Sequence, residues 1–154
     1  MRAFDVSGNF GGLSVVGDKT EKTILVVEDD ADMNELMCTV LEEAGYRTIS
    51  VSNGEHGIES VKTNKPDLVL LDIELPQMNG IEVCRAITSD ETTRGIPVIM
   101  VTINRDISKK LSSYIAGARR YITKPFGVDE LVGEVRKTLR QLDIPASNLL
   151  DPRD

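Results

Sequence analysis

Residues 67–80 decide the fold of this chain, and they read Asp67-Leu-Val-Leu-Leu-Asp72-Ile-Glu-Leu-Pro-Gln-Met-Asn-Gly80. The four consecutive apolar residues from Leu68 to Leu71 predict a strand buried on both faces, as in a parallel sheet. This strand runs directly into the carboxylate of Asp72. Ligands of open α/β sheets bind beyond the carboxyl ends of the strands. Asp72 is therefore a candidate functional residue, although an Asp after a strand is also a common turn residue.

The rest of the chain alternates strands and helices around this central strand. Short apolar runs predict further strands at residues 24–27, 46–51, 97–102 and 119–123. The pattern of apolar and loop-forming residues predicts helices at residues 33–44, 53–62, 81–88, 106–116 and 128–142. This order predicts an α/β fold with a parallel sheet, right-handed crossovers and helices on both faces. Five strands suit a single flavodoxin-like (βα)5 domain with strand order 2-1-3-4-5.

The first and last helices carry apolar stripes that we expect to face the core. The stripe of the first helix comprises Met33, Leu36, Met37, Val40, Leu41 and Ala44, and that of the last helix comprises Leu131, Val135, Leu139 and Leu142. Residues 1–22 contain four glycines that interrupt every apolar run, and we expect a flexible leader there. Residues 143–154 have no periodicity and are expected to form a tail, which leaves residues 23–142 as the folded domain.

Composition limits the classes of protein to which the chain can belong. The formal net charge of −7 gives no sign of nonspecific nucleic-acid or membrane binding. Cys38 and Cys84 lack the spacing of a disulfide framework or a metal site, which is typical of reduced thiols in a cytosolic protein. No apolar run approaches the roughly 18 residues of a membrane span. We therefore expect a cytoplasmic protein without a direct nucleic-acid or membrane partner.

Polar side chains follow four of the predicted strands at the same edge of the sheet. The first strand is followed by Glu28 and Asp29, the third by Asp72 and the fifth by Lys124, while Thr102 ends the fourth. Clustered carboxylates need a cation, and oxygen ligands without His or Cys favour Mg²⁺. Together these groups suit phosphoryl chemistry, with Asp72 as nucleophile, Lys124 as cation and Thr102 as hydroxyl donor. The acids after the first strand would also suit a helix N-terminus.

The motifs at these positions resemble those of a response-regulator receiver domain, the phosphoacceptor module of two-component signalling. The resemblance covers residues 23–142 and rests on four motifs in order and spacing. These are Ile24-Leu-Val-Val-Glu-Asp-Asp30, Leu70-Leu-Asp-Ile-Glu-Leu-Pro-Gln-Met-Asn-Gly80, Val101-Thr102, and Ala116-Gly-Ala followed by Tyr121-Ile-Thr-Lys-Pro-Phe126.

The resemblance implies a signalling switch rather than an enzyme with a separate substrate. Asp72 would accept a phosphoryl group from the phosphohistidine of a sensor histidine kinase or a phosphotransfer protein. Glu28 and Asp29 would form the acidic pair, with Asp29 a direct ligand, and the backbone carbonyl of Glu74 would complete the Mg²⁺ site. Thr102 and Tyr121 would form the switch pair that alters the surface of strand five and the last helices for a downstream effector or a dimer partner. A cis peptide is expected at Lys124-Pro125.

Two residues and one charge pattern stand apart from these motifs. Ile103 follows Thr102 where similar domains carry a small residue, so we expect it to narrow the entrance to the phosphorylation site. His56, the single histidine, is expected to be exposed. Residues 23–104 carry 5 basic and 15 acidic residues, whereas residues 105–140 carry 9 basic and 4 acidic ones. The following basic residues either mark a partner surface or are ordinary solvated charges: Arg105, Lys109, Lys110, Arg119, Arg120, Arg136, Lys137 and Arg140.

Two other classes of protein remain as alternatives. A haloacid-dehalogenase-like phosphohydrolase also uses an aspartyl phosphate and Mg²⁺, but its nucleophile belongs to an Asp-x-Asp pair on an early strand. A flavin-binding module has the same strand order, but it needs a glycine- or hydroxyl-rich phosphate loop after the first strand, where this chain carries acids. Turnover of a phosphate ester would favour the first alternative, and a yellow, flavin-loaded protein would favour the second.

Overall fold

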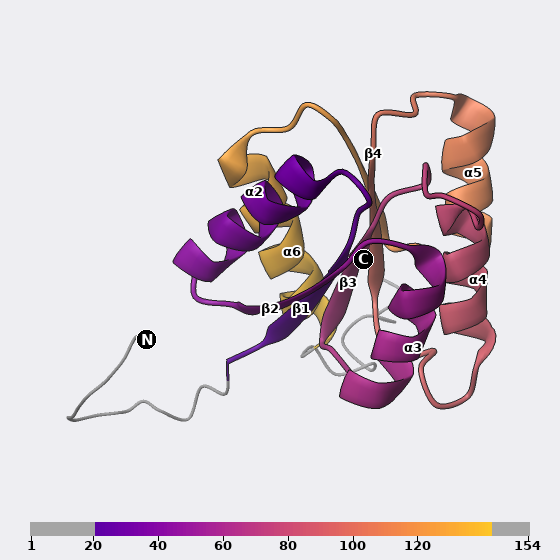
Figure 1. Ribbon diagram of the computed structural model, residues 1–154, viewed down its shortest axis with the longest axis horizontal. Helices are drawn as coiled ribbons and strands as arrows, with labels where there is room; N and C mark the ends of the chain where they lie inside the picture. Colours follow the sequence, from indigo (N-terminus) through magenta and orange to yellow (C-terminus); the bar gives the residue numbers. More distant parts are fainter. Residues whose placement is uncertain (1–20, 143–154) are drawn as a thin grey trace, which may run out of the picture.

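A five-stranded parallel sheet lies between two layers of helices in the computed structural model, which describes residues 21–142 (Figure 1). The strand order is β2-β1-β3-β4-β5, and every neighbouring pair is parallel. The fold class and strand order predicted from the sequence are confirmed. The central strand β3 pairs with β1 on one side and β4 on the other, and Leu70 lies between Val26 and Ile99.

The elements differ from the predicted boundaries by no more than two residues. In chain order they are β1 (Thr23–Val27), α2 (Ala31–Glu43), β2 (Arg47–Val51), α3 (Gly54–Asn64), β3 (Leu68–Leu71), α4 (Gly80–Ser89), β4 (Val98–Thr102), α5 (Ile107–Ile115), β5 (Arg120–Thr123) and α6 (Val128–Leu142). The predicted leader and tail lie almost wholly outside the described residues. Within residues 21–142, no helix combines the length and apolar character needed to cross a membrane.

Helices α2 to α5 each begin with a capping side chain close to the carboxyl edge of the sheet. Asp30, Asn53, Asn79 and Asp106 each accept a hydrogen bond from a backbone N–H of the first helical turn. Asn79 also forms a capping box with Glu82, because each side chain bonds the backbone N–H of the other residue. These caps fix the loops that leave the strands, and those loops carry the candidate site.

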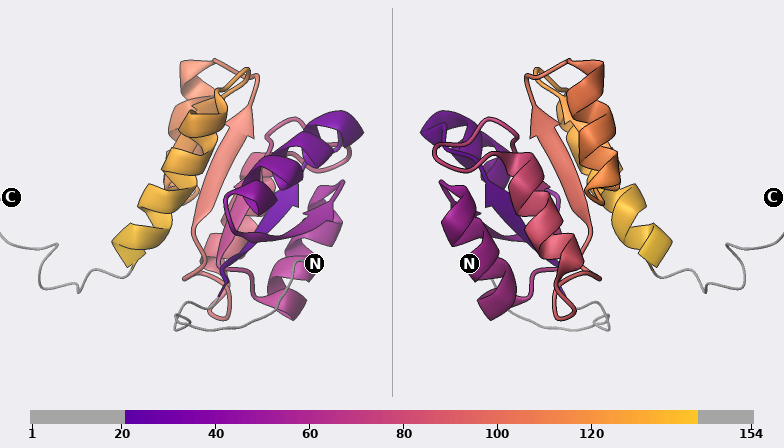
Figure 2. Two further views of the ribbon diagram at one scale, coloured as in Figure 1. Left: turned by 90° about the vertical axis from the view of Figure 1, so that its left-hand side faces the viewer. Right: turned by 90° about the vertical axis from the view of Figure 1, so that its right-hand side faces the viewer.

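Two hydrophobic clusters cover the two faces of the sheet. Alternate residues of each central strand point to opposite faces: Leu25 contributes to one cluster and Val26 to the other. Helices α2 and α6 cover one face, and α3, α4 and α5 cover the other (Figures 1 and 2). Most of the predicted inward-facing side chains of α2 and α6 are buried or partly buried in one of these clusters.

Two of the predicted core positions are wrong. Leu36 is 48% exposed, because it lies about 100° around α2 from the fully buried Met37 and so misses the inward stripe. Asn34 lies on that stripe instead and is buried. Leu142 is 41% exposed. It ends a helix of 15 residues, about 22 Å long, whereas β5 has 4 residues and spans about 13 Å.

Candidate functional site

The carboxylates of Glu28, Asp29 and Asp72 converge at the carboxyl edge of the sheet. Glu28 and Asp29 directly follow β1, and Asp72 directly follows the neighbouring strand β3. One oxygen from each carboxylate lies within 4.8 Å of the others. Glu28 and Asp72 are buried, while Asp29 is exposed to solvent. One open side and an all-oxygen donor set suit a hard divalent cation that keeps several water ligands.

Lys124 brings a positive charge into this cluster from the end of β5. Its ammonium group donates hydrogen bonds to Glu28 and, at 3.1 Å, to Asp72. The exposed fractions of these three side chains are 10% for the lysine, 1% for Glu28 and 6% for Asp72. The Lys124-Pro125 peptide is cis, as predicted.

Burial and pairing act in opposite directions on these charges. Burial opposes the charge of Lys124, but its hydrogen bonds and its attraction to Glu28 and Asp72 outweigh burial and raise the pKa of the amine. Burial also raises the pKa of the Glu28 carboxyl, although the hydrogen bond from Lys124 lowers it in part. The lysine is therefore a permanent cation at neutral pH.

Thr102 and Tyr121 are connected by hydrogen bonds to the backbone of the same residue, Asn104. Thr102 is fully buried at the end of β4, and its hydroxyl oxygen accepts a hydrogen bond from the Asn104 N–H at 3.2 Å. The half-buried Tyr121 donates its hydroxyl to the Asn104 carbonyl at 2.7 Å. Burial, with a further contribution from nearby acids, raises the pKa of Tyr121. The predicted switch residues thus meet at one loop residue that the sequence did not single out.

Ile103 and Glu74 line the approach to Asp72. A shallow pocket of about 550 Å³ is lined by Asp29, Asp72, Glu74, Ile103 and Lys124, among other residues. Ile103 is 65% exposed, so its branched side chain projects at the mouth of this pocket. The Glu74 backbone N–H donates to Asp72 at 3.0 Å, which places the loop after β3 against the candidate phosphoacceptor.

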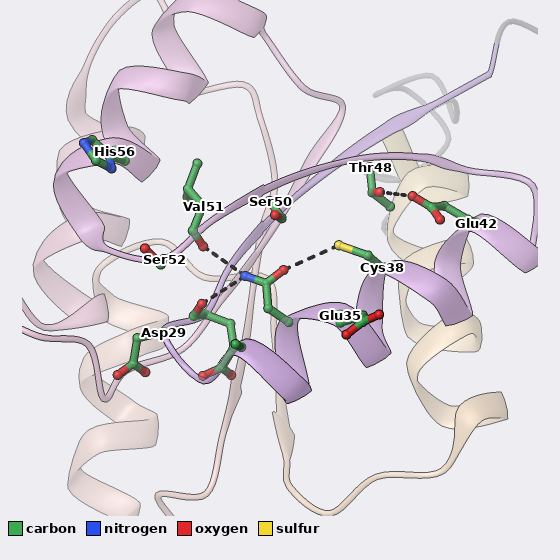
Figure 3. Close-up of a pocket in the computed structure, with 12 residues that line it drawn as sticks. Asp29, Glu35, Cys38, Glu42, Thr48, Ser50, Val51, Ser52 and His56 are labelled. Carbon is green, nitrogen blue, oxygen red and sulfur yellow. Dashed lines mark hydrogen bonds between the residues drawn. The ribbon is translucent and has the colours of Figure 1, made fainter.

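A second pocket, of about 640 Å³, lies beside the acidic pair between α2 and β2 (Figure 3). The Asn34 amide donates to the carbonyls of Glu28 at 2.9 Å and Val51 at 3.0 Å, and its oxygen accepts from the Cys38 thiol at 3.5 Å. Asn34 therefore joins α2 to the ends of β1 and β2. Sequence reasoning missed it, although it lies three residues before Met37 on the inward face of α2. His56 is exposed as predicted and lines the same pocket.

Curated relatives correct one expectation about partners. Over 137 residues the chain is 39% identical to the DNA-binding response regulator MtrA of Mycobacterium tuberculosis. Over 120 residues it is 41% identical to the phosphate regulon transcriptional regulatory protein PhoB of Pseudomonas aeruginosa. These matches cover 89% and 78% of this chain but only 59% and 52% of the relatives. The expectation of no nucleic-acid partner is wrong, because similar regulators are named for DNA binding or transcriptional regulation. The expectation rested on the net charge of this chain alone, and this chain spans just over half of the length of these relatives.

A family model and solved structures identify the family to which the chain belongs. The model of the response regulator receiver domain matches residues 24–136. The fold is similar to a CheY-like receiver domain protein from Methanospirillum hungatei JF-1, with a TM-score of 0.76, 29% identity, and coverage of 80% of this chain and 98% of the other. It is also similar to the receiver domain of RstA from Klebsiella pneumoniae, with a TM-score of 0.72, 30% identity, and coverage of 78% and 100%. These matches give no support to a haloacid-dehalogenase-like phosphohydrolase. The chain belongs to the response regulator receiver domain family of two-component systems.

Proposed function

We propose that Asp72 is the phosphoacceptor of this receiver domain. In this proposal Asp72 attacks the phosphorus of a phosphohistidine on a sensor histidine kinase or phosphotransfer protein. The Asp72–phosphorus bond forms as the phosphorus–nitrogen bond breaks, and the histidine departs with its electron pair. The observation that carries the proposal is the convergence of three carboxylates with the Lys124 ammonium at the end of the central strand.

The neighbouring residues have separate parts in this reaction. Glu28, Asp29 and Asp72, together with the Glu74 backbone carbonyl, would hold Mg²⁺, which would neutralise charge on the transferring phosphoryl group. Lys124 contacts Asp72 and would pair with a phosphoryl oxygen after transfer. The domain would thus contribute its own catalytic groups, so a small phosphodonor could replace the kinase.

The response to phosphorylation would begin at Thr102. Its hydroxyl would donate to the phosphoryl group instead of accepting from the loop that follows β4, and Tyr121 would adjust because both residues bond to that loop. We place this switch in a cytoplasmic regulator. Because MtrA is named as DNA-binding and PhoB as a transcriptional regulatory protein, we also propose that the switch controls an event on DNA.

Phosphorylation by a small donor tests the phosphoacceptor directly. The protein is incubated with acetyl phosphate and Mg²⁺, and intact mass spectrometry should show the addition of one phosphoryl group. Asp72→Asn should abolish this addition, whereas Asp129→Asn, an exposed acid at the start of α6, should leave it unchanged. Unchanged labelling of Asp72→Asn would place the phosphoacceptor elsewhere. Omitting Mg²⁺ should also prevent labelling, and labelling at the same rate in EDTA would contradict the metal's role.

Binding to random double-stranded DNA tests the second part of the proposal. Filter binding with and without acetyl phosphate should show retention that falls with salt and changes on phosphorylation. Retention that is the same in both conditions would mean that this chain does not itself pass its phosphorylation state to DNA.

A further inference from the structure

Asn104 is the residue through which three parts of the site are connected. Its backbone N–H and C=O bond to Thr102 and Tyr121, as described above. Its side-chain amide donates to the Glu74 carboxylate at 2.9 Å, across a separation of 30 residues in sequence. Its side-chain oxygen accepts from the Asp106 N–H at 2.9 Å, which orients the amide within its own loop. The loop after β4 is thereby tied to the loop after β3.

The hydrogen bond to Asn104 fixes the position of a charge at the entrance of the site. Glu74 is exposed and lines the pocket that leads to Asp72. It is only two residues from Asp72, and the Lys124 ammonium in the same pocket attracts carboxylates. Without the bond to Asn104, the Glu74 side chain would be free to turn toward this cation. It would then compete with an anionic phosphodonor for the same space.

We propose that Asn104 is a positioning residue for phosphoryl transfer. It holds the Glu74 carboxylate against the loop after β4 and so keeps that negative charge out of the path of the incoming phosphodonor. This inference rests on the proposed function of Asp72, because it concerns the same reaction.

A double-mutant cycle tests whether Asn104 acts through Glu74. Initial rates of phosphorylation are measured against acetyl phosphate concentration, at saturating Mg²⁺, for wild type, Asn104→Ala, Glu74→Ala and the double variant. Asn104→Ala should raise the half-saturating donor concentration by about threefold and change the maximal rate little, as expected for coupled neighbours. In the Glu74→Ala background, Asn104→Ala should have no such effect. Asn104→Ala removes the hydrogen bond from the Asp106 N–H to the Asn104 side chain in both backgrounds, so the contribution of that bond cancels.

Glu74→Gln provides a second, milder variant. It retains an acceptor for the Asn104 amide but removes the charge, so the half-saturating donor concentration should be no higher than in wild type. The inference would be overturned if Asn104→Ala had an equal effect in both backgrounds or no effect in either. It would also be overturned if Glu74→Gln had a higher half-saturating donor concentration than wild type. Melting curves of all variants should overlap that of wild type. The proposed function fails separately, when wild type is not labelled or Asp72→Asn still is.

Discussion

Replacing Lys124 with Met should destabilise the domain strongly, because it removes the cation from a buried acidic cluster. Coulomb's law gives about 5 kcal/mol for the attraction between unit charges 3.1 Å apart at an effective dielectric constant of about 20. Removing one partner of a buried ion pair typically costs about 3–5 kcal/mol, since it leaves an uncompensated charge. We therefore expect Lys124→Met to lower the free energy of unfolding by about 3 kcal/mol at neutral pH without Mg²⁺.

Urea unfolding with and without Mg²⁺ measures this loss and its recovery. In the proposed function Mg²⁺ binds the cluster of the folded protein and not the unfolded chain, so it should raise stability in both proteins. The rise should be larger in Lys124→Met, where the ion supplies charge that the lysine supplies in wild type. Lys62→Met is the matched control: Lys62 is 56% exposed, lies 3.8 Å from Asp90, and should cost no more than about 0.5 kcal/mol. Equal losses in the two variants, or an equal Mg²⁺-dependent rise in Lys124→Met and wild type, would refute the reasoning.

Three other changes have defined outcomes. Ile103→Ala should speed phosphorylation by acetyl phosphate about fivefold, equivalent to ~1 kcal/mol in the barrier, because a smaller side chain opens the mouth of the pocket. If the variant has a wild-type melting curve, an equal or slower rate would show that Ile103 does not obstruct the donor. Asn34→Ala should lower the free energy of unfolding by about 2 kcal/mol, because the buried Glu28 carbonyl loses its donor and the Val51 carbonyl keeps only the Glu28 N–H. A urea curve that overlaps wild type would mean that water replaces the amide. The raised pKa of Glu28 means that its contribution to stability is full below pH 4.5, the ordinary value, and is lost as pH rises through the raised pKa. In Mg²⁺-free urea unfolding, the stability of Glu28→Gln relative to wild type should therefore increase as the pH rises above 4.5, and a difference that does not vary with pH would count against this assignment.

The fold could be predicted because its signals are local and repeated. Each buried strand of a parallel sheet is a continuous apolar run, and Leu68–Leu71 is fully buried as that rule requires. The wrong core assignments occurred where the burial of a side chain depends on its position on the helix rather than on its residue type. Leu36 is apolar but faces away from the sheet, whereas Asn34 is polar and faces inward. Apolar character alone does not reveal which face of a helix the sheet will cover.

The charged residues of the site could be predicted, but the amides that hold them could not. Parallel strands end at one edge, so a carboxylate after each of two strands implies a cluster. Asn104 and Asn34 act through hydrogen bonds to residues as far as 30 positions away. Such bonds depend on how two segments of the chain pack together. The residue type alone does not show whether an asparagine bonds to a distant segment or only to solvent. The spacing of Asn34 on the inward face of α2 was the one available signal.

The charges of the site suit Lys124 together with the divalent cation proposed above. The three carboxylates of the cluster carry three negative charges, and Lys124 cancels one of them. The remaining two match one Mg²⁺ ion, which an all-oxygen site can hold with several waters. Lys124 alone therefore leaves the cluster repulsive, and a metal alone would leave one buried negative charge uncompensated. Asparagines are suited to position these groups, because an amide donates hydrogen bonds without altering this balance. A charged residue in place of Asn34 or Asn104 would change the affinity for the metal as well as the geometry of the site.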